Sequence, residues 1–169
     1  PEYEVIDDKP DTYTGRCLGL DFGFVNDPTA IVDIRMEGWD LFVDLLCYEQ
    51  GLLNSHIADY LNANALNRVI TVCDSAEQKS IVELQQKRIK AIPCVKGRGS
   101  VAAGIAQVKQ FKLHVTKRSV KLLDELDNYK WIKDEVSDTY TNEAIDAWNH
   151  ALDALRYGVD FLIRKYRPK

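Results

Sequence analysis

Two aspartates directly follow short apolar runs of the sequence, where a buried strand would end. Asp21 comes after CLGL, and Asp74 comes after VITVC. Ligands of open α/β sheets bind at the edge formed by the carboxyl ends of the strands, so both side chains would face a ligand there. Asp74 has a second interpretation, because an acid followed three residues later by Glu77 also fits a helix cap. For Asp21 that alternative is weaker, since no helix is expected after it.

A third set of candidate ligands lies near the end of the chain, in a segment with helical periodicity. Asp146, His150 and Asp153 are spaced i, i+4 and i+7, which aligns them on one stripe of a helix. Such a stripe is often only a solvated face, but acids that flank a histidine repel one another unless water or a cation screens them. Carboxylates from two strand ends and one helix could hold two Mg²⁺ or Mn²⁺ ions about 4 Å apart for in-line displacement at phosphorus. The pattern predicts a metal-dependent nuclease.

The charge of the chain is distributed unevenly along the sequence. The net charge of −4 and the pI of about 5.4 would by themselves argue against a nucleic-acid partner. Residues 79–121, however, contain eleven Lys or Arg and a single acid, Glu83, so this segment carries +10 and the rest of the chain −14. A basic segment of this kind suits the phosphate backbone of DNA, although it could also be a plain solvated face.

Five side chains of the basic segment are predicted to contact the DNA backbone: Lys79, Lys96, Arg98, Lys109 and Lys117. The segment contains one aromatic residue, Phe111, so base stacking is not expected. Binding of double-stranded DNA should therefore be independent of its sequence and strongly dependent on salt.

An α/β pattern of short strands and helices is predicted to position these residues. Three apolar runs joined by short turns indicate an antiparallel meander, and alternating helices and strands then indicate βαβ units around a mixed central sheet flanked by helices. The predicted strands are residues 16–21, 29–35, 39–48, 68–73, 91–95 and 113–116. The first predicted helix runs from 54 or 55 to 66, and a second one follows residues 74–77 and ends at about 87. The other predicted helices are 100–110, 119–127 and 142 or 143 to 163. Tyr129 and Trp131 alternate around Lys130, which suggests a hairpin strand near the site.

Composition limits the class of protein. A chain of 169 residues that is 46% apolar and 28% charged is typical of one globular domain and excludes a disordered or fibrous protein. Residues 1–14 are predicted to be an arm or linker, and residues 15–169 the folded domain. The four cysteines form no C-x-x-C pair, so a zinc site is not expected, and no apolar run approaches the roughly 18 residues that span a bilayer.

Three segments of the sequence resemble the acidic motifs of one family. GLDFG with NDPTA, CDSAE and NHALDALRY are similar to the three motifs of the C-terminal nuclease domain of tailed-phage terminase large subunits, and they occur in the same order. The resemblance spans about residues 15–160 and implies a ribonuclease H-like fold. It also implies an endonuclease that cuts concatemeric viral DNA during genome packaging. Matched motif by motif, Asp21, Asp74 and Asp153 would be the metal-binding catalytic carboxylates, and His150 a helper beside the metal, with Asp146 a weaker candidate.

The resemblance also implies partners. The family's full-length protein carries an ATPase motor domain, but this sequence has no G-x-x-x-x-G-K-[ST] and is not expected to be that motor. Residues 1–14 would then be the interdomain linker, the portal and the small terminase subunit would be partners, and the host cytoplasm the location. Three alternatives remain open: a Holliday-junction resolvase or transposase-like nuclease of the same fold, an actin-like nucleotide-binding lobe, and a DNA-binding module without catalytic activity.

Overall fold

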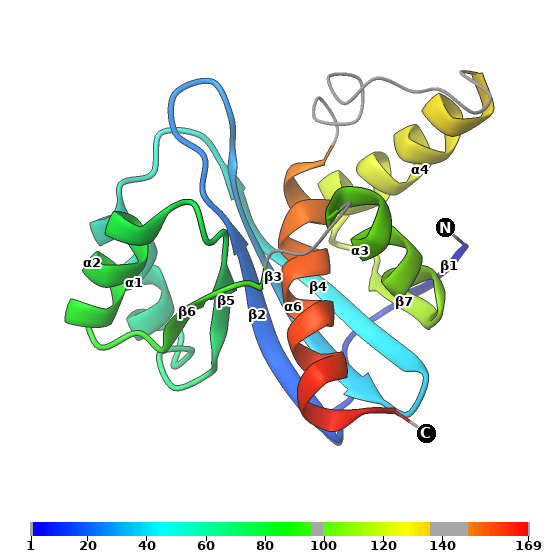
Figure 1. Cartoon of the computed structure of the whole chain (residues 1–169), viewed down its shortest axis with the longest axis horizontal. Coiled ribbons are helices and arrows are strands. Elements are labelled where there is room, and N and C mark those ends of the chain that lie inside the picture. Colours follow the sequence, from blue (N-terminus) through cyan, green and yellow to red (C-terminus); the bar gives the residue numbers. More distant parts are fainter. Residues whose placement is uncertain (1, 96–99, 136–148, 169) are drawn as a thin grey trace.

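A seven-stranded mixed β-sheet forms the centre of the molecule. The computed structural model describes residues 2–95, 100–135 and 149–168. The strands lie in the order β1-β7-β4-β3-β2-β5-β6 (Figure 1). Their bounds are β1 (Tyr3–Ile6), β2 (Gly15–Asp21), β3 (Thr29–Glu37), β4 (Asp40–Glu49), β5 (Thr71–Cys73), β6 (Ala91–Pro93) and β7 (Lys112–Thr116).

The directions of the strands confirm the predicted α/β arrangement. β2, β3 and β4 form the antiparallel meander. β5 pairs in parallel with β2, and β6 pairs in parallel with β5, while β7 and β1 extend the other side of the sheet in parallel. Because β2 and β5 run in the same direction, Asp21 at the end of β2 and Asp74 just after β5 emerge at the same edge of the sheet.

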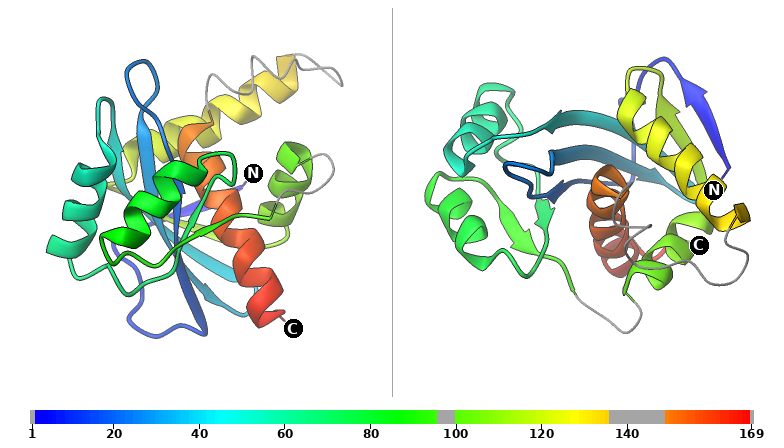
Figure 2. Two further views of the ribbon diagram at one scale, coloured as in Figure 1. Left: turned by 60° about the vertical axis from the view of Figure 1, so that its left-hand side comes forward. Right: turned by 90° about the horizontal axis from the view of Figure 1, so that it is seen from above.

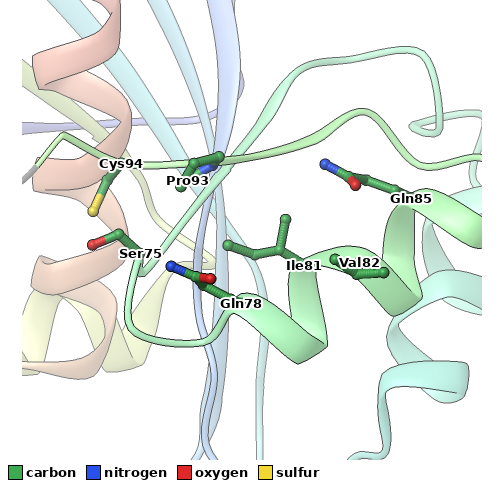
Figure 3. Close-up of a pocket in the computed structure, with 7 residues that line it drawn as sticks. All are labelled: Ser75, Gln78, Ile81, Val82, Gln85, Pro93 and Cys94. Carbon is green, nitrogen blue, oxygen red and sulfur yellow. The ribbon is translucent and has the colours of Figure 1, made fainter.

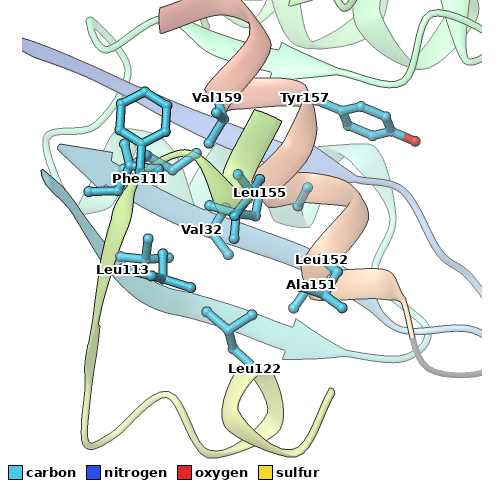
Figure 4. Packing of buried hydrophobic residues seen from close by; sticks show 14 of the residues in the cluster. Val32, Phe111, Leu113, Leu122, Ala151, Leu152, Leu155, Tyr157 and Val159 are labelled. Atoms are coloured by element: carbon cyan, nitrogen blue, oxygen red, sulfur yellow. The ribbon is translucent and has the colours of Figure 1, made fainter. Parts of the chain in front are cut away.

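Helices cover both faces of the sheet. The described residues form α1 (Asn54–Ala63), α2 (Gln78–Gln86), α3 (Ser100–Lys109), α4 (Val120–Glu135) and α6 (His150–Tyr166). α3, α4 and α6 pack on one face over a core that includes Val32, Leu122 and Leu155 (Figure 4). α1 and α2 pack against the other face, over Leu20 and Ile31, and Figure 2 shows these two helices grouped apart from the other three. No helix in these ranges is long and apolar enough to cross a membrane.

α6 approaches β2 unusually closely, and a glycine makes this possible. A Cβ atom built on Gly19 would overlap the main-chain oxygen of Ala154, and this oxygen belongs to the backbone, so it cannot turn away. Ala154 follows Asp153 in α6, and Gly19 lies two residues before Asp21 in β2. The contact therefore fixes the separation of two of the chain segments that carry the predicted site.

We expect Gly19→Ala to destabilise the domain because α6 must move outward to admit the methyl group. Overpacking of a buried site costs about 1–3 kcal/mol, and the movement would also separate Asp153 from Asp21. Chemical denaturation should detect the loss of stability. The control is Gly38→Ala, in the exposed turn between β3 and β4, where an added Cβ meets no atom within 4 Å but φ is +56°. Gly38→Ala would be strained only locally, so a loss of stability in Gly19→Ala no larger than in Gly38→Ala would contradict the structural role of the close contact.

Part of the predicted N-terminal arm belongs to the sheet. Residues Tyr3–Ile6 form β1, which pairs with β7. The reason is that Tyr3, Val5 and their neighbours can continue the parallel pairing at the sheet edge, and the Tyr3 ring packs against the core. That residues 1–14 connect this domain to another one stays a prediction.

Residues 7–14, called the strap below, lie against the sheet and are held there by ion pairs. Asp33 and Asp44 face each other on β3 and β4, and both carboxylates are buried. Lys9 from the strap reaches both, with Nζ 3.0 Å from Asp33 and 2.7 Å from Asp44. Arg16 pairs with Asp33 through two hydrogen bonds, and Arg118 pairs with Asp44 in the same way. The strap is thus part of the folded domain.

Two local predictions are wrong. Tyr129 and Trp131 do not form a hairpin strand, because α4 runs to Glu135 and includes both residues. The Tyr129 side chain is buried in the core below α4. Three alternating residues fit a strand and one turn of a helix equally well, and here the packing of α4 on the sheet decides for the helix. The predicted start of the last helix at 142 or 143 is also wrong, because α6 begins at His150 and Asn149 is its non-helical cap residue. The candidate Asp146 therefore does not belong to α6, and it lies outside the described residues.

Candidate active site

Asp21 occupies the last position of β2, at the carboxyl edge of the sheet. Its carboxylate is nearly buried, and Oδ2 lies 3.5 Å from Nδ1 of His150. Burial raises the pKa of Asp21, the contact with His150 lowers it, and the charge of Asp74 raises it further, so that the pKa lies above its ordinary value. An ionised carboxylate at this position is costly, and a bound cation would relieve the cost.

His150, the first residue of α6, lies between two acids. Its ring contacts Asp21 through Nδ1 and Asp27 through Nε2, each at 3.5 Å. The contact with Asp21 raises the pKa of His150, burial lowers it, and the charges of Asp21, Glu125 and Asp27 raise it, with a net rise. The neighbouring acids therefore stabilise the protonated form of the ring more than water does.

Asp153 lies one helical turn after His150, in the first turn of α6. Its Oδ1 accepts a hydrogen bond from Nε of Arg156 at 3.0 Å. The neighbouring Tyr157 is buried, which raises the pKa of its phenol, and the charges of Asp153, Asp21 and Asp74 each raise it further. Ala154, the residue after Asp153, packs on Gly19 of β2, so the start of α6 lies beside the strand that ends at Asp21.

Asp74 lies just beyond β5 and beside Asp21 in the parallel pair of strands. Its Oδ1 accepts a hydrogen bond from the backbone N–H of Ala76 at 3.0 Å, while Glu77 occupies the cap position of α2. The capping alternative is thus realised only in part, because the side chain closes the turn before α2 rather than the helix itself.

The donors fit a hard divalent cation in type. Asp21 and Asp74 at the sheet edge and Asp153 on α6 offer the oxygen ligands that Mg²⁺ and Mn²⁺ prefer. Within residues 2–95, 100–135 and 149–168, however, no group of three His, Cys, Asp or Glu side chains is already arranged as a metal site. The contacts explain this, because Asp21 is turned toward His150, Asp153 toward Arg156 and Asp74 toward Ala76. Metal binding would require these side chains to exchange a protein partner for the cation.

Comparison with protein families identifies the domain. Residues 21–160 match the family model described as the terminase RNase H-like domain. The chain belongs to this family. The match includes all three carboxylates and confirms both the ribonuclease H-like fold and the resemblance to terminase nuclease domains. Comparison by sequence with curated proteins gave no match.

Solved structures of terminases share the fold of this terminase domain. The nuclease domain of the large terminase g2p from bacteriophage SPP1, crystallised with bound Mn, is 21% identical with a TM-score of 0.76, over 94% of this chain and 96% of that one. The large terminase nuclease of the thermophilic phage G20c with bound magnesium is 19% identical with a TM-score of 0.60, over 91% and 84%. The large terminase of another thermophilic bacteriophage is 17% identical with a TM-score of 0.69, over 95% of this chain but 43% of that one. The terminase domain therefore spans less than half of this third, longer protein.

The residues predicted to contact DNA lie in different parts of the terminase domain. Lys79 is exposed in the first turn of α2, five residues after Asp74. Lys109 ends α3, and Lys117 follows β7, where Nζ pairs with Asp7 at 3.3 Å. Lys96 and Arg98 lie outside the described residues. Lys79 is thus the described candidate nearest in sequence to a predicted catalytic acid, and the DNA contacts remain predictions.

Sequence reasoning did not single out two side chains of the candidate site. Asp27 contacts His150, and Arg156 contacts Asp153. Both lie inside the segments that carry the resemblance, NDPTA and NHALDALRY, and Arg156 stands at i+3 from Asp153, a spacing that signals a helical ion pair. Asp27 lies in a turn and Arg156 is a cation, so neither fits the pattern of acids at strand ends and on one helix stripe.

A pocket of about 400 Å³ lies beside the terminase site, between the loop after β5 and α2 (Figure 3). Ser75, Gln78 and Cys94 are among the residues that line it. None of the three carboxylates lines this pocket.

Proposed function

We propose that this terminase domain is an endonuclease that hydrolyses phosphodiester bonds of double-stranded DNA and cuts concatemeric viral DNA during genome packaging. The observation that carries the proposal is that Asp21 and Asp74 emerge at the same edge of the sheet, while Asp153 lies in the first turn of α6, which packs directly on β2 at Gly19. The bound Mn and magnesium in the SPP1 and G20c nuclease structures support a metal-dependent reaction.

Asp21, Asp74 and Asp153 are the residues that would hold two divalent ions, Mg²⁺ or Mn²⁺. Such ions, when bound, lower the pKa of a water molecule that attacks the phosphate and stabilise the leaving 3′ oxygen. Asp21 is the best candidate for a shared ligand because it ends a central strand, which holds its backbone rigidly.

His150 is proposed to orient Asp21 and to carry a proton. Its two ring nitrogens face Asp21 and Asp27. The ring can therefore hold a proton on either nitrogen, against one of these two carboxylates. Arg156, which pairs with Asp153, would add a positive charge beside the bound phosphate.

The proposed setting is a packaging complex in the host cytoplasm. Lys79 and the other basic candidates, Lys96, Arg98, Lys109 and Lys117, would contact the DNA backbone without reading its sequence. An ATPase motor domain of the same full-length protein, the portal and the small terminase subunit are proposed partners. The 43% share of the longer large terminase that matches this chain supports the linked motor domain.

Plasmid cleavage tests the function directly. We expect the domain to nick supercoiled plasmid DNA with Mn²⁺ or Mg²⁺ and to be inactive with excess chelator. Linear duplex should be cut at least as well as a four-way junction of the same sequence. Strong preference for the junction would favour a resolvase, and binding of DNA without cleavage under any metal condition would favour a module that only binds DNA. Tight binding of ATP measured by calorimetry would instead favour a nucleotide-binding lobe.

A further inference from the structure

The start of α6 is capped in an unusual way. Asn149 occupies the cap position, but its side chain makes no capping hydrogen bond. Its Oδ1 is buried and finds no hydrogen-bond partner among the described residues. The first backbone N–H groups of a helix need acceptors, and a local Asn, Asp or Ser side chain is the usual source. Here the local side chain does not supply them.

Glu125, from the middle of α4, supplies the acceptors instead. Its Oε2 accepts a hydrogen bond from the N–H of Ala151 at 3.1 Å, and Oε1 accepts one from Leu152 at 3.0 Å. The hydroxyl of Tyr48 donates a third hydrogen bond to Oε2 at 2.7 Å. The Glu125 residue is 2% exposed, so water contributes little to its solvation. One buried carboxylate thus connects α4, β4 and α6.

This arrangement is more costly than an ordinary cap. Burial raises the pKa of Glu125 to about 7, although the hydrogen bonds from Leu152, Tyr48 and Ala151 lower it. A buried carboxylate is tolerated only when its oxygens are hydrogen-bonded. A polar side chain at position 149 could cap the helix without burying a charge, so capping alone does not explain why the carboxylate comes from another helix. What Glu125 adds is a connection between distant elements.

The connected elements are those that carry the proposed site. The first turn of α6 holds His150 and Asp153. On the sheet side, Tyr48 lies opposite Ala30, and Ala30 lies opposite Asp21 on the next strand. The Tyr48 ring also meets the His150 ring edge-on, with 6.3 Å between the centroids. Glu125 therefore ties the helical part of the site to the strand part.

We propose that Glu125 is a positioning residue that, together with Tyr48, holds the first turn of α6 at the distance from β2 at which Asp21 and Asp153 can share divalent cations. The inference rests on the proposed nuclease function. Glu125 itself does not touch the metal or the DNA, and it acts through the backbone N–H groups of Ala151 and Leu152. Its effect should resemble that of other outer-shell partners of metal ligands, whose loss lowers metal affinity or activity about 10–100-fold.

Glu125→Gln tests the inference because it keeps the size of the side chain but replaces one acceptor oxygen by a donor that faces an N–H. The matched control is Asp124→Asn, which removes the same charge from the exposed neighbouring position of α4. We expect Glu125→Gln to weaken Mn²⁺ binding, measured by calorimetry, and plasmid nicking by about 10–100-fold. Hydrogen exchange should become faster at the amides of Ala151 and Leu152. Tyr48→Phe, which leaves the carboxylate in place, should produce smaller changes of the same kind.

The outcomes separate the two proposals. A folded Glu125→Gln protein that binds Mn²⁺ and nicks DNA as Asp124→Asn does would overturn the positioning role, and the nuclease function would stand. If Glu125→Gln does not fold at the assay temperature, the same measurements on Tyr48→Phe test the positioning role: unchanged Mn²⁺ binding, nicking and hydrogen exchange in that variant would overturn it. A parent domain that neither binds Mn²⁺ nor nicks DNA would overturn both proposals.

Discussion

Asp21→Asn is expected to reduce nicking of plasmid DNA by at least about 100-fold, since loss of a metal ligand should cost no less than the 10–100-fold typical of outer-shell partners. The substitution keeps the shape of the side chain and removes the charge that would bind a cation. Asp59→Asn, on the exposed surface of α1, is the matched control and should cut DNA as the parent does. Nicking by Asp21→Asn within about threefold of the parent rate would refute the assignment of Asp21.

The same substitution should not destabilise the metal-free domain. The pKa of Asp21 is raised, first by burial, so its ionised form costs folding free energy at neutral pH, and a neutral amide avoids that cost. We therefore expect the Tm of Asp21→Asn to equal or exceed that of the parent without metal. With Mn²⁺ at 100 times its Kd, the parent should gain about 2.7 kcal/mol, or roughly 5–10 °C in Tm, and the variant should gain little. A large gain in the variant would mean that Mn²⁺ binds elsewhere.

Asp33→Asn is expected to destabilise the domain by about 3–5 kcal/mol, the cost of removing one partner from a buried ion pair. Asp33 is 1% exposed and faces Lys9, Arg16 and Arg35, which would be left without their common anion. The control is Glu37→Gln at the exposed end of the same strand, where the carboxylate accepts a hydrogen bond from Thr14. This substitution should lower the free energy of unfolding by less than about 1 kcal/mol. Urea denaturation at pH 7 measures the free energy of unfolding of both variants.

Lowering the pH should reduce the difference in the free energy of unfolding between Asp33→Asn and the parent. Burial raises the pKa of Asp33, but the hydrogen bond from Arg16 and the charge of Lys9 outweigh it and leave the pKa below its ordinary value. Asp44 behaves in the same way through Arg118 and Lys9. A lowered carboxyl pKa stabilises the fold fully above the unfolded value of about 3.9, and this contribution is lost as the pH falls through the folded value. A difference in stability that stayed constant from pH 7 to pH 3 would contradict this account.

Much of the strand part of the site was predictable from local sequence. Asp21 and Asp74 each follow an apolar run with β-branched or leucine residues, and such a run marks where a central strand ends. The pairing of β2 with β5 then brings the two acids together. The packing of α6 against β2 was harder to predict from the sequence. It depends on the absence of a side chain at Gly19, and the sequence pattern does not show which element a glycine will contact.

The contacts that cross long distances in sequence were not predictable. Glu125 looks like any acid of a surface helix, yet it is buried against residues 77 positions before it and 26 positions after it. The strap is similar, because the acidic and proline-containing residues 1–14 read locally as a linker, while Lys9 satisfies two buried aspartates on β3 and β4. Asp33 and Asp44 interrupt apolar strands in the sequence, and this interruption was the one available sign that cations must come from elsewhere.

The close contact between Gly19 and Ala154 also bears on how freely the rest of the sequence can change. The gap between the strand that carries Asp21 and the helix that carries Asp153 is set by main-chain atoms, as long as residue 19 is glycine. Core side chains elsewhere can then be exchanged, provided that their total volume is kept, without altering the spacing of the acids. A fold held at a TM-score of 0.76 with only 21% identity to the SPP1 domain is what such tolerance would produce.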